Sequence, residues 1–249
     1  MAKDNQFAFE CPHLEASIRQ ELSSRFGWDS NVREITLQDM AKLNSELGAE
    51  DGHLTLHGYL ISSLSALAKL TNLRSLFVNS SQIKDFSILD ELPVFTDLDL
   101  GPSLILPTNR HNLNKSSGAA PFVLYRPPTR VEGSEMEIED LSPLCELRNL
   151  KSLNISSLHK VIDLSPLAGM KNLRSLRLSG YNLTDYSPLC GLTNLKELFL
   201  PYCQLTDPSF LTKLTHLKNL TLLRSNFSDQ QTRDLAKALP GCSLQLSLN

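Results

Sequence analysis

EDLSPLCELRNLKSLNI, at residues 139–155, is the first of four copies of one pattern. The others are IDLSPLAGMKNLRSLRL (162–178), TDYSPLCGLTNLKELFL (184–200) and TDPSFLTKLTHLKNLTL (206–222). Their aligned leucines, Leu153, Leu176, Leu198 and Leu220, follow one another at steps of 23, 22 and 22 residues. A period in this range, with leucines spaced L-x-x-L-x-L, is typical of a leucine-rich repeat solenoid. We therefore predict an α/β solenoid, a leucine-rich repeat horseshoe with a concave parallel sheet.

The same period continues toward the N-terminus in a weaker form. Apolar pairs stand at Leu54/Leu56, Leu76/Val78 and Leu98/Leu100, again 22 residues apart. Each pair is expected to form a short strand with two side chains facing the core. A helical or 3₁₀ turn should return the chain after each strand. Aspartates recur just before these turns, where a carboxylate can accept backbone N–H bonds; they are Asp85, Asp140, Asp163, Asp185 and Asp207.

The period is interrupted at residues 101–137, where glycines and prolines are frequent. Phe122, Val123 and Leu124 lie 24 residues after Leu98, so we predict one degenerate strand there, in register with its neighbours. Irregular loops are expected on both sides of it. Long loops in compact domains often carry function. A tolerated insertion is the alternative interpretation.

Both ends of the repeat array need a cap, because the terminal repeats would otherwise expose the leucine core to water. Residues 1–45 predict a helical N-terminal cap, with Pro12 at a first helical position, a Glu15–Arg19 pair and a Thr36–Asp39 capping box. Residues 228–249 predict a C-terminal cap made of a helix and a final strand, with Ser228 and Gln231 as its capping box. The repeats occupy 46–227, and we expect one continuous structural unit.

Composition restricts the cellular compartments and the classes of partner that we expect for this protein. The chain has 249 residues, 50 of them leucine, and a formal net charge of −3, which does not favour nucleic acid or an anionic membrane as a partner. The start carries no apolar signal segment, and no run is long and apolar enough to span a membrane. A cytoplasmic monomer is expected, either resident or translocated into a host cell as an effector. The five cysteines should be free thiols; they are Cys11, Cys145, Cys190, Cys203 and Cys242.

No catalytic motif stands in the sequence. GxSxG, HExxH, P-loop and GxGxxG patterns are missing, so we predict that the protein is not an enzyme and uses no cofactor. His53 and His57 should share one face of the sheet with Asp97 and Asp99. They could form a weak metal or acid–base cluster, but a solvated binding face is the preferred interpretation.

Three segments of the sequence resemble a known protein family. CPHLEASIRQEL (11–22), ITLQDMAKLN (35–44) and ISSLSALAKLTNLRSLFV (61–78) resemble the cap and first repeats of bacterial internalin-type leucine-rich repeat proteins. The ISDLSPLxxLTNLxxLxL pattern of that family is similar to residues 61–78 and 161–200. The resemblance covers about 9–222 and implies recognition of a protein on the concave face.

The predicted binding site lies on the outward side chains of the strands. Exposed aromatic residues together with arginine are frequent hot-spot residues at protein interfaces. The predicted protein-binding residues are Phe77, Asp97, Asp99, Arg177, Phe199, Tyr202, Leu223 and Arg224. Two functions remain open: a bacterial scaffold or translocated effector that binds another protein, and an inhibitor or immunity protein that blocks one enzyme or toxin.

Overall fold

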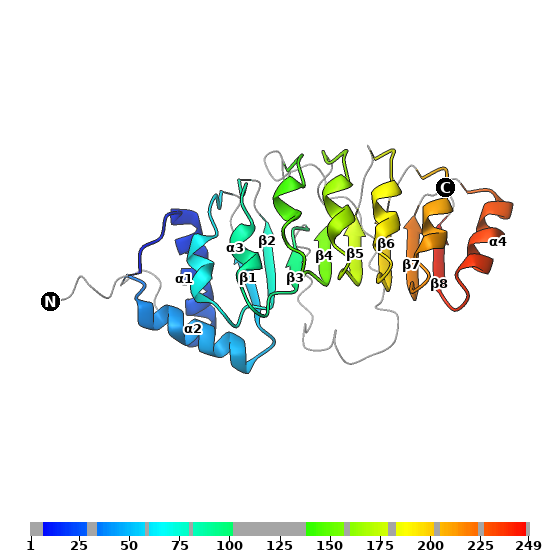
Figure 1. Ribbon diagram of the computed structural model, residues 1–249. Coiled ribbons are helices and arrows are strands. Elements are labelled where there is room, and N and C mark those ends of the chain that lie inside the picture. The colour runs from blue at the N-terminus through cyan, green and yellow to red at the C-terminus, as the bar shows by residue number, and fades with distance from the viewer. Residues whose placement is uncertain are drawn as a thin grey trace.

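The computed structural model describes residues 7–28, 34–57, 60–79, 82–101, 138–156, 160–178, 183–201, 205–223 and 227–247. Its centre is one open sheet of eight parallel strands that follow one another in chain order. Figure 1 shows these strands side by side between the N-terminal helices and the C-terminal helix. The strands are β1 (His53–His57), β2 (Ser75–Asn79), β3 (Asp97–Asp99), β4 (Ser152–Ile155), β5 (Ser175–Leu178), β6 (Glu197–Pro201), β7 (Asn219–Leu223) and β8 (Ser243–Ser247).

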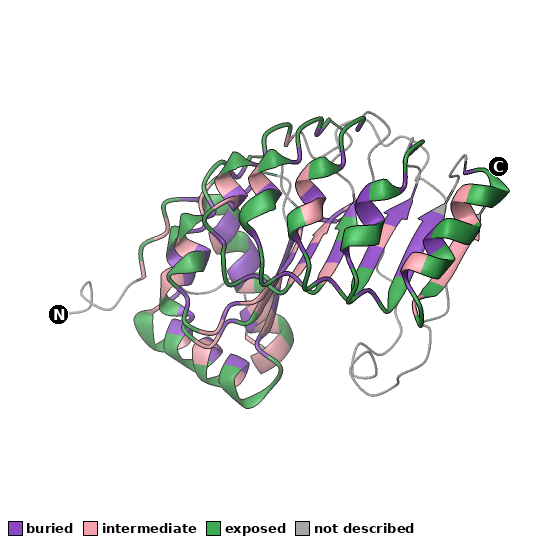
Figure 2. Ribbon diagram, turned by 45° about the vertical axis from the view of Figure 1, so that its right-hand side comes forward, coloured by how far each residue is buried: buried purple, intermediate pink, exposed green. Residues whose placement is uncertain are grey.

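Short helical turns return the chain between most strands, because parallel neighbours require a crossover connection. In Figure 2 their exposed sides face outward and their buried residues face the sheet. The turns are η1 (Ser65–Lys69), α3 (Ser87–Asp90), η3 (Ser142–Leu144), η4 (Ser165–Gly169), η5 (Ser187–Gly191) and η6 (Ser209–Lys213). Proline occupies one of the first two positions of η3, η4 and η5, where a missing N–H costs nothing.

The predicted role of the repeated aspartates is confirmed. Before five of these turns an Asp Oδ1 atom accepts a hydrogen bond from the backbone N–H of the Ser two residues later, at 2.8 or 2.9 Å. These bonds from serine backbone and side chain lower the pKa of every one of these carboxyls. We name the set the aspartate row; it contains Asp85, Asp140, Asp163, Asp185 and Asp207.

The core is the inward row of the sheet. Strand register aligns one leucine from each of the eight strands, and the first seven of these leucines are buried. Leu244 of β8 is half-buried against the same core. Removing about 25 cal/mol of free energy per Å² of apolar surface from water is what holds such repeats together. The inward row is Leu54, Leu76, Leu98, Leu153, Leu176, Leu198, Leu220 and Leu244.

The N-terminal cap consists of α1 (Pro12–Phe26) and α2 (Leu37–Ala49). Helix α1 ends at Gly27, whose φ of 63° lies in the left-handed region that suits glycine. Helix α2 begins with the predicted capping box between Thr36 and Asp39, in which both hydrogen bonds are present. The predicted Glu15–Arg19 pair is also present, with 2.7 Å between Oε1 and Nη2. The local signals of this cap were therefore readable from the sequence.

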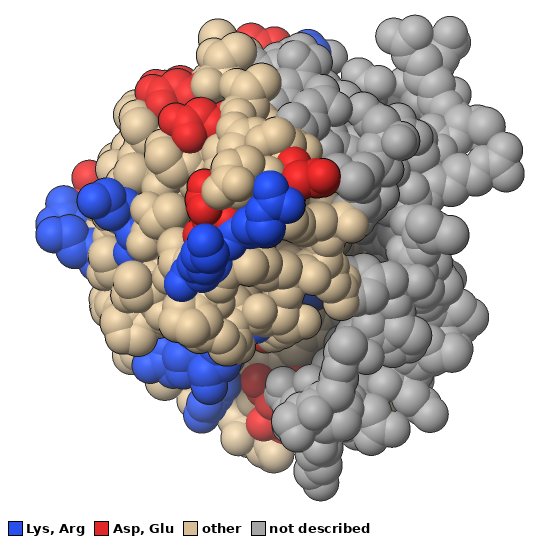
Figure 3. Space-filling model, turned by 90° about the vertical axis from the view of Figure 1, so that its right-hand side faces the viewer, with Lys and Arg blue, Asp and Glu red and all other residues tan. Residues whose placement is uncertain are grey.

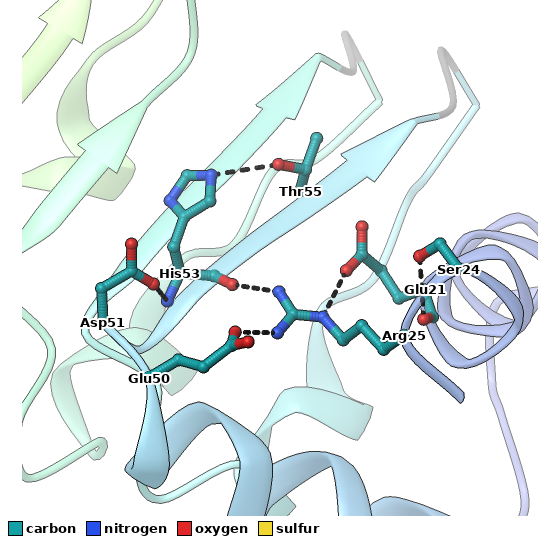
Figure 4. Close-up of polar contacts among 7 residues, drawn as sticks. All are labelled: Glu21, Ser24, Arg25, Glu50, Asp51, His53 and Thr55. Carbon is teal, nitrogen blue, oxygen red and sulfur yellow. Dashed lines mark hydrogen bonds and ion pairs between the residues drawn. The ribbon is translucent and has the colours of Figure 1, made fainter. Parts of the chain in front are cut away.

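Helix α1 also covers the free edge of β1, which would otherwise offer its backbone to another chain. The hydroxyl of Ser17 accepts a bond from the N–H of His57 at 2.7 Å, and Ser17 is 98% buried (2% exposed). At the other end of the strand, Arg25 donates to the carbonyl of His53 at 2.8 Å and pairs with Glu21 and Glu50 (Figure 4). Burial lowers the pKa of Arg25, but the two carboxylates more than offset this, so the net shift is upward.

The C-terminal cap is a helix followed by the last strand. Helix α4 (Asp229–Ala238) begins with the predicted Ser228–Gln231 capping box, and its Leu235 is buried in the core. Strand β8 then pairs with β7 in parallel. The last strand of the sheet thus belongs to the C-terminal cap. A longer amphipathic helix covers the last repeat, as expected from the sequence.

The prediction that residues 122–124 form a strand of the sheet, between the strands of Leu98 and Leu153, was wrong. Strand β3 is paired directly with β4, with Asp97 opposite Ser152 and Leu98 opposite Leu153. A strand has two edges, and those of β3 are taken by β2 and β4, so no further strand fits between them. Phe122, Val123 and Leu124 themselves lie outside the described residues.

Four of the five cysteines lie in the described part of the chain, and all four are free thiols: Cys11, Cys145, Cys190 and Cys242. Cys203 lies outside it. The Cys11 thiol is buried beside α1, and burial raises its pKa. Hydrogen bonds, first among them one from the N–H of Ser62, outweigh burial and lower the pKa to about 7. Of the described helices, none has both the length and the apolar character needed to cross a membrane.

Candidate protein-binding face

The outward side chains of the strands form a second row, directly beside the inward leucines. Register places one residue of each strand at the centre of the face that points away from the core. Unlike the inward row, this row changes chemistry at almost every step. The outward row is Thr55, Phe77, Asp99, Asn154, Arg177, Phe199, Thr221 and Gln245.

Polar contacts fix the first strands of this face. The ring of His53 lies 3.0 Å from the hydroxyl of Ser75 through Nδ1 and 3.0 Å from that of Thr55 through Nε2. Asp97 accepts a 2.6 Å hydrogen bond from the hydroxyl of Thr96. The described residues contain no group of three His, Cys, Asp or Glu side chains placed to hold a metal ion. Through its contact with Ser75, His53 forms a hydrogen-bonding bridge between β1 and β2.

Asp99 holds the end of β3. Its Oδ1 atom accepts bonds from the N–H of Gly101 at 2.8 Å and from the side-chain amide of Asn154 at 3.0 Å. A Cβ atom at position 101 would lie 2.6 Å from the Asn154 amide nitrogen, so a larger residue there would require this side chain to shift. Asp99 thus links β3 to β4 at the point where the chain enters the 102–137 segment.

Phe77 departs from its predicted exposure. Sequence alternation places it on the outward face, which is correct, but its side chain is 4% exposed and therefore buried. It does not belong to the leucine core, and the ring of His57 lies 6.5 Å away, tilted by 54°. The expectation of an exposed aromatic residue at this position was wrong. A buried ring is a weaker candidate for direct contact with a partner.

Arg177 and Phe199 are two predicted site residues whose side chains contact each other. They are register partners on β5 and β6, and the guanidinium carbon lies 5.8 Å from the centre of the phenyl ring. This distance is within the range of a cation–π interaction. Arg177 is exposed and Phe199 is half-buried. The pair therefore offers a flat apolar surface with a positive charge, near the middle of the outward face.

The remaining predicted residues stand on other strands or lie outside the described residues. Asp97 and Asp99 stand on β3, two strands from Arg177, so they do not join the pair. Leu223 ends β7, opposite the buried Pro201 of β6. Its side chain is not among those described. Tyr202 and Arg224 also lie outside the described residues.

A row of basic residues at the beginning of the strands was missed in the sequence. The residue directly before the first strand position is basic in four consecutive repeats: Lys151, Arg174, Lys196 and Lys218. The signal was present as the repeated N-L-K or N-L-R pattern and its variant H-L-K. It is visible only when the 22-residue period is used to align charges as well as leucines.

Comparison with known proteins adds the fold family. No family model and no curated protein matches the chain. Among solved structures, internalin C2 of Listeria monocytogenes aligns with a TM-score of 0.62 at 22% identity, over 96% of this chain and 87% of that one. The chain has an internalin-type leucine-rich repeat fold.

Two further structures agree with this internalin-type fold. Internalin F of Listeria monocytogenes aligns with a TM-score of 0.59 at 22% identity, over 97% of this chain and 58% of that one. A leucine-rich repeat protein of Leptospira interrogans aligns at 0.50 and 20% identity, over 83% and 46%. The chain thus spans about half the length of these two larger proteins. At such identities the likeness concerns the fold.

Proposed function

We propose that this chain is a non-catalytic protein-binding module that recognises another protein through the outward face of its sheet. The observation that carries the proposal is the Arg177–Phe199 pair on an open parallel sheet. Arginine and aromatic residues dominate binding energy at protein interfaces. Their neighbours on the same face include Ser152, Asn154 and Ser175, whose short side chains leave room for a partner to approach the pair.

The proposal is consistent with the chemistry of the rest of the face. Its polar residues mainly bind one another, as His53 does with Ser75 and Asp99 with Asn154. Such contacts hold side chains in place before a partner arrives, which reduces the entropy lost on binding. The face is thereby a preorganised surface, with Arg177 and Phe199 as the anchors that we propose for the partner.

Site-specific photocrosslinking in the native organism tests this function. A photoreactive phenylalanine analogue at position 199 should yield one discrete covalent adduct with a protein partner. The same analogue at position 213, an exposed lysine on the opposite side of the solenoid, serves as the control and should yield no such adduct. Equal adducts from both positions, or none from 199, would contradict recognition through this face.

A further inference from the structure

A groove of about 470 Å³ lies along the edge of the sheet where the strands begin. Its basic lining residues are Lys151, Arg174 and Lys196, together with His216, and no Asp or Glu among the described residues lines it. Each of the three cations stands directly before the first residue of β4, β5 or β6. This groove is separate from the Arg177–Phe199 pair, which lies on the outward face.

Backbone bonds place the three cations at neighbouring positions. The N–H of Arg174 donates to the carbonyl of Lys151 at 2.7 Å, and the N–H of Lys196 donates to that of Arg174 at 2.8 Å. Lys218 continues the same series. Successive backbones are therefore about 4.8 Å apart, one strand spacing. All of these side chains are exposed, and none forms an ion pair within the described part of the chain.

Amide side chains from neighbouring repeats fix the wall of the groove. Asn172 donates to the carbonyl of Arg148 at 2.9 Å, and Asn194 donates to that of Lys171 at 2.8 Å. His216 takes the corresponding place in the next repeat, with Nδ1 2.9 Å from the carbonyl of Thr193. These bonds tie each repeat to the one before it. They leave the positive charges above a rigid base and without an ion-pair partner among the described residues.

The aspartate row and the basic row lie at different edges of the solenoid. The aspartate row lies at the start of the return turns, which follow the ends of the strands, whereas the basic row precedes their beginnings. In Figure 3, viewed from the C-terminal end, Asp and Glu gather near the top of the described surface, and Lys and Arg lie at the left, in the middle and near the bottom, where further Asp and Glu are also seen. The net charge of −3 therefore conceals a local positive groove.

We propose that this groove binds a short acidic segment of a polypeptide in an extended conformation. The cations of three consecutive strands span about 10 Å, the length of about three extended residues. Clustered like charges that have no ion-pair partner among the described residues favour a ligand of opposite charge and speed its association. A nucleic acid fits less well, because no exposed Phe, Tyr or Trp among the described lining residues offers a base a stacking surface; Phe95 is 4% exposed.

The test is an NMR titration of the full chain with hexaglutamate at about 0.02 M salt, where surface charges are weakly screened. Amide shifts should concentrate at residues 149–152, 172–175 and 194–197, and they should disappear at about 0.5 M salt. Hexalysine is the peptide control and should produce no shifts there. Shifts confined to other regions, or no binding of hexaglutamate, would overturn the proposal.

Charge reversal supplies the matched variants. Lys151→Glu/Arg174→Glu/Lys196→Glu should weaken hexaglutamate binding at least about tenfold, since each exposed pair contributes only modestly. Lys69→Glu/Lys213→Glu/Lys237→Glu changes the net charge equally at exposed positions away from the groove and should change binding less than about twofold. Equal weakening by both triples would show an effect of net charge and overturn a groove site.

Two further measurements separate the remaining outcomes. If the groove triple is unfolded by circular dichroism, the single variant Lys196→Gln takes its place and should still weaken hexaglutamate binding measurably. A thymidine hexanucleotide or inorganic phosphate that displaces hexaglutamate at lower concentration would overturn a polypeptide ligand. Phe199→Ala should leave hexaglutamate binding unchanged, so failure of the outward-face proposal can be told apart from failure of this one.

Discussion

The two faces of the same strands differ in how they use the repeat. On the inward row every strand contributes a leucine, and seven of the eight are buried. On the outward row the chemistry changes from Thr55 through Asp99 to Gln245, and exposure along the row ranges from buried to exposed. Repetition is required where one continuous core must be filled, and it is not required where side chains face solvent or a partner. The difference teaches that the repeated core and the variable outward surface are encoded at alternate positions of one strand.

The largest expected effect comes from breaking the inward face. Leu178→Asp places an unpaired carboxylate at a position that is 0% exposed and should lower the free energy of unfolding by about 3–5 kcal/mol. The matched control is Arg177→Asp, one residue earlier and exposed on the outward face, which should cost about 1 kcal/mol or less. Urea denaturation measures both. Similar losses for the two variants would remove the distinction between the faces.

An intermediate effect on stability is expected at β1, the first strand of the sheet. Arg25→Ala removes the bond to the His53 carbonyl and leaves Glu21 and Glu50 without their shared cation, so we expect a loss of about 1–3 kcal/mol. Arg148→Ala, whose exposed ion pair with Glu146 is 3.6 Å long, is the control and should cost about 0.5 kcal/mol or less. Thermal unfolding of these two variants would show whether the contacts of Arg25 stabilise the edge strand β1.

A smaller effect concerns the aspartate row, and it depends on pH. The folded-state pKa of each of these carboxyls is lowered, so their stabilising effect is present above the unfolded pKa of about 3.9 and is lost as the pH falls through the folded pKa. Stability should therefore drop below about pH 4. In Asp163→Ala/Asp185→Ala, urea midpoints measured between pH 7 and pH 3 should fall less steeply than in the wild type. Parallel slopes would show that these two aspartates do not contribute.

The repeat and its caps could be predicted because they depend on local signals. Leucine spacing set the register of β4 to β7, and the Thr36–Asp39 and Ser228–Gln231 capping boxes were both found as expected. These features need only a few neighbouring residues to be recognised. Each follows from hydrogen-bond geometry within one turn or from alternation within one strand.

Features that depend on distant contacts could not be predicted in this way. An apolar run such as 122–124 suggests a strand but does not say which edge is free, and β4 already occupies the edge of β3. Alternation showed which face Phe77 lies on but not what covers it. The basic groove combines residues that are one repeat apart, so it becomes visible once the register between strands is known. The pairing of Arg177 with Phe199 across β5 and β6 follows the same rule.

The smallest effect on stability should accompany the largest effect on binding, at Phe199. Because Phe199 is half-buried on the outward face, Phe199→Ala should change the free energy of unfolding by less than about 1 kcal/mol. The most direct test of recognition through the outward face is the affinity of the captured partner for Phe199→Ala, compared with its affinity for Ser152→Ala on the same face. We predict a loss of about 2 kcal/mol or more, roughly thirtyfold in Kd, for Phe199→Ala and almost none for Ser152→Ala. Equal affinities for the wild type and both variants would contradict recognition through the Arg177–Phe199 pair.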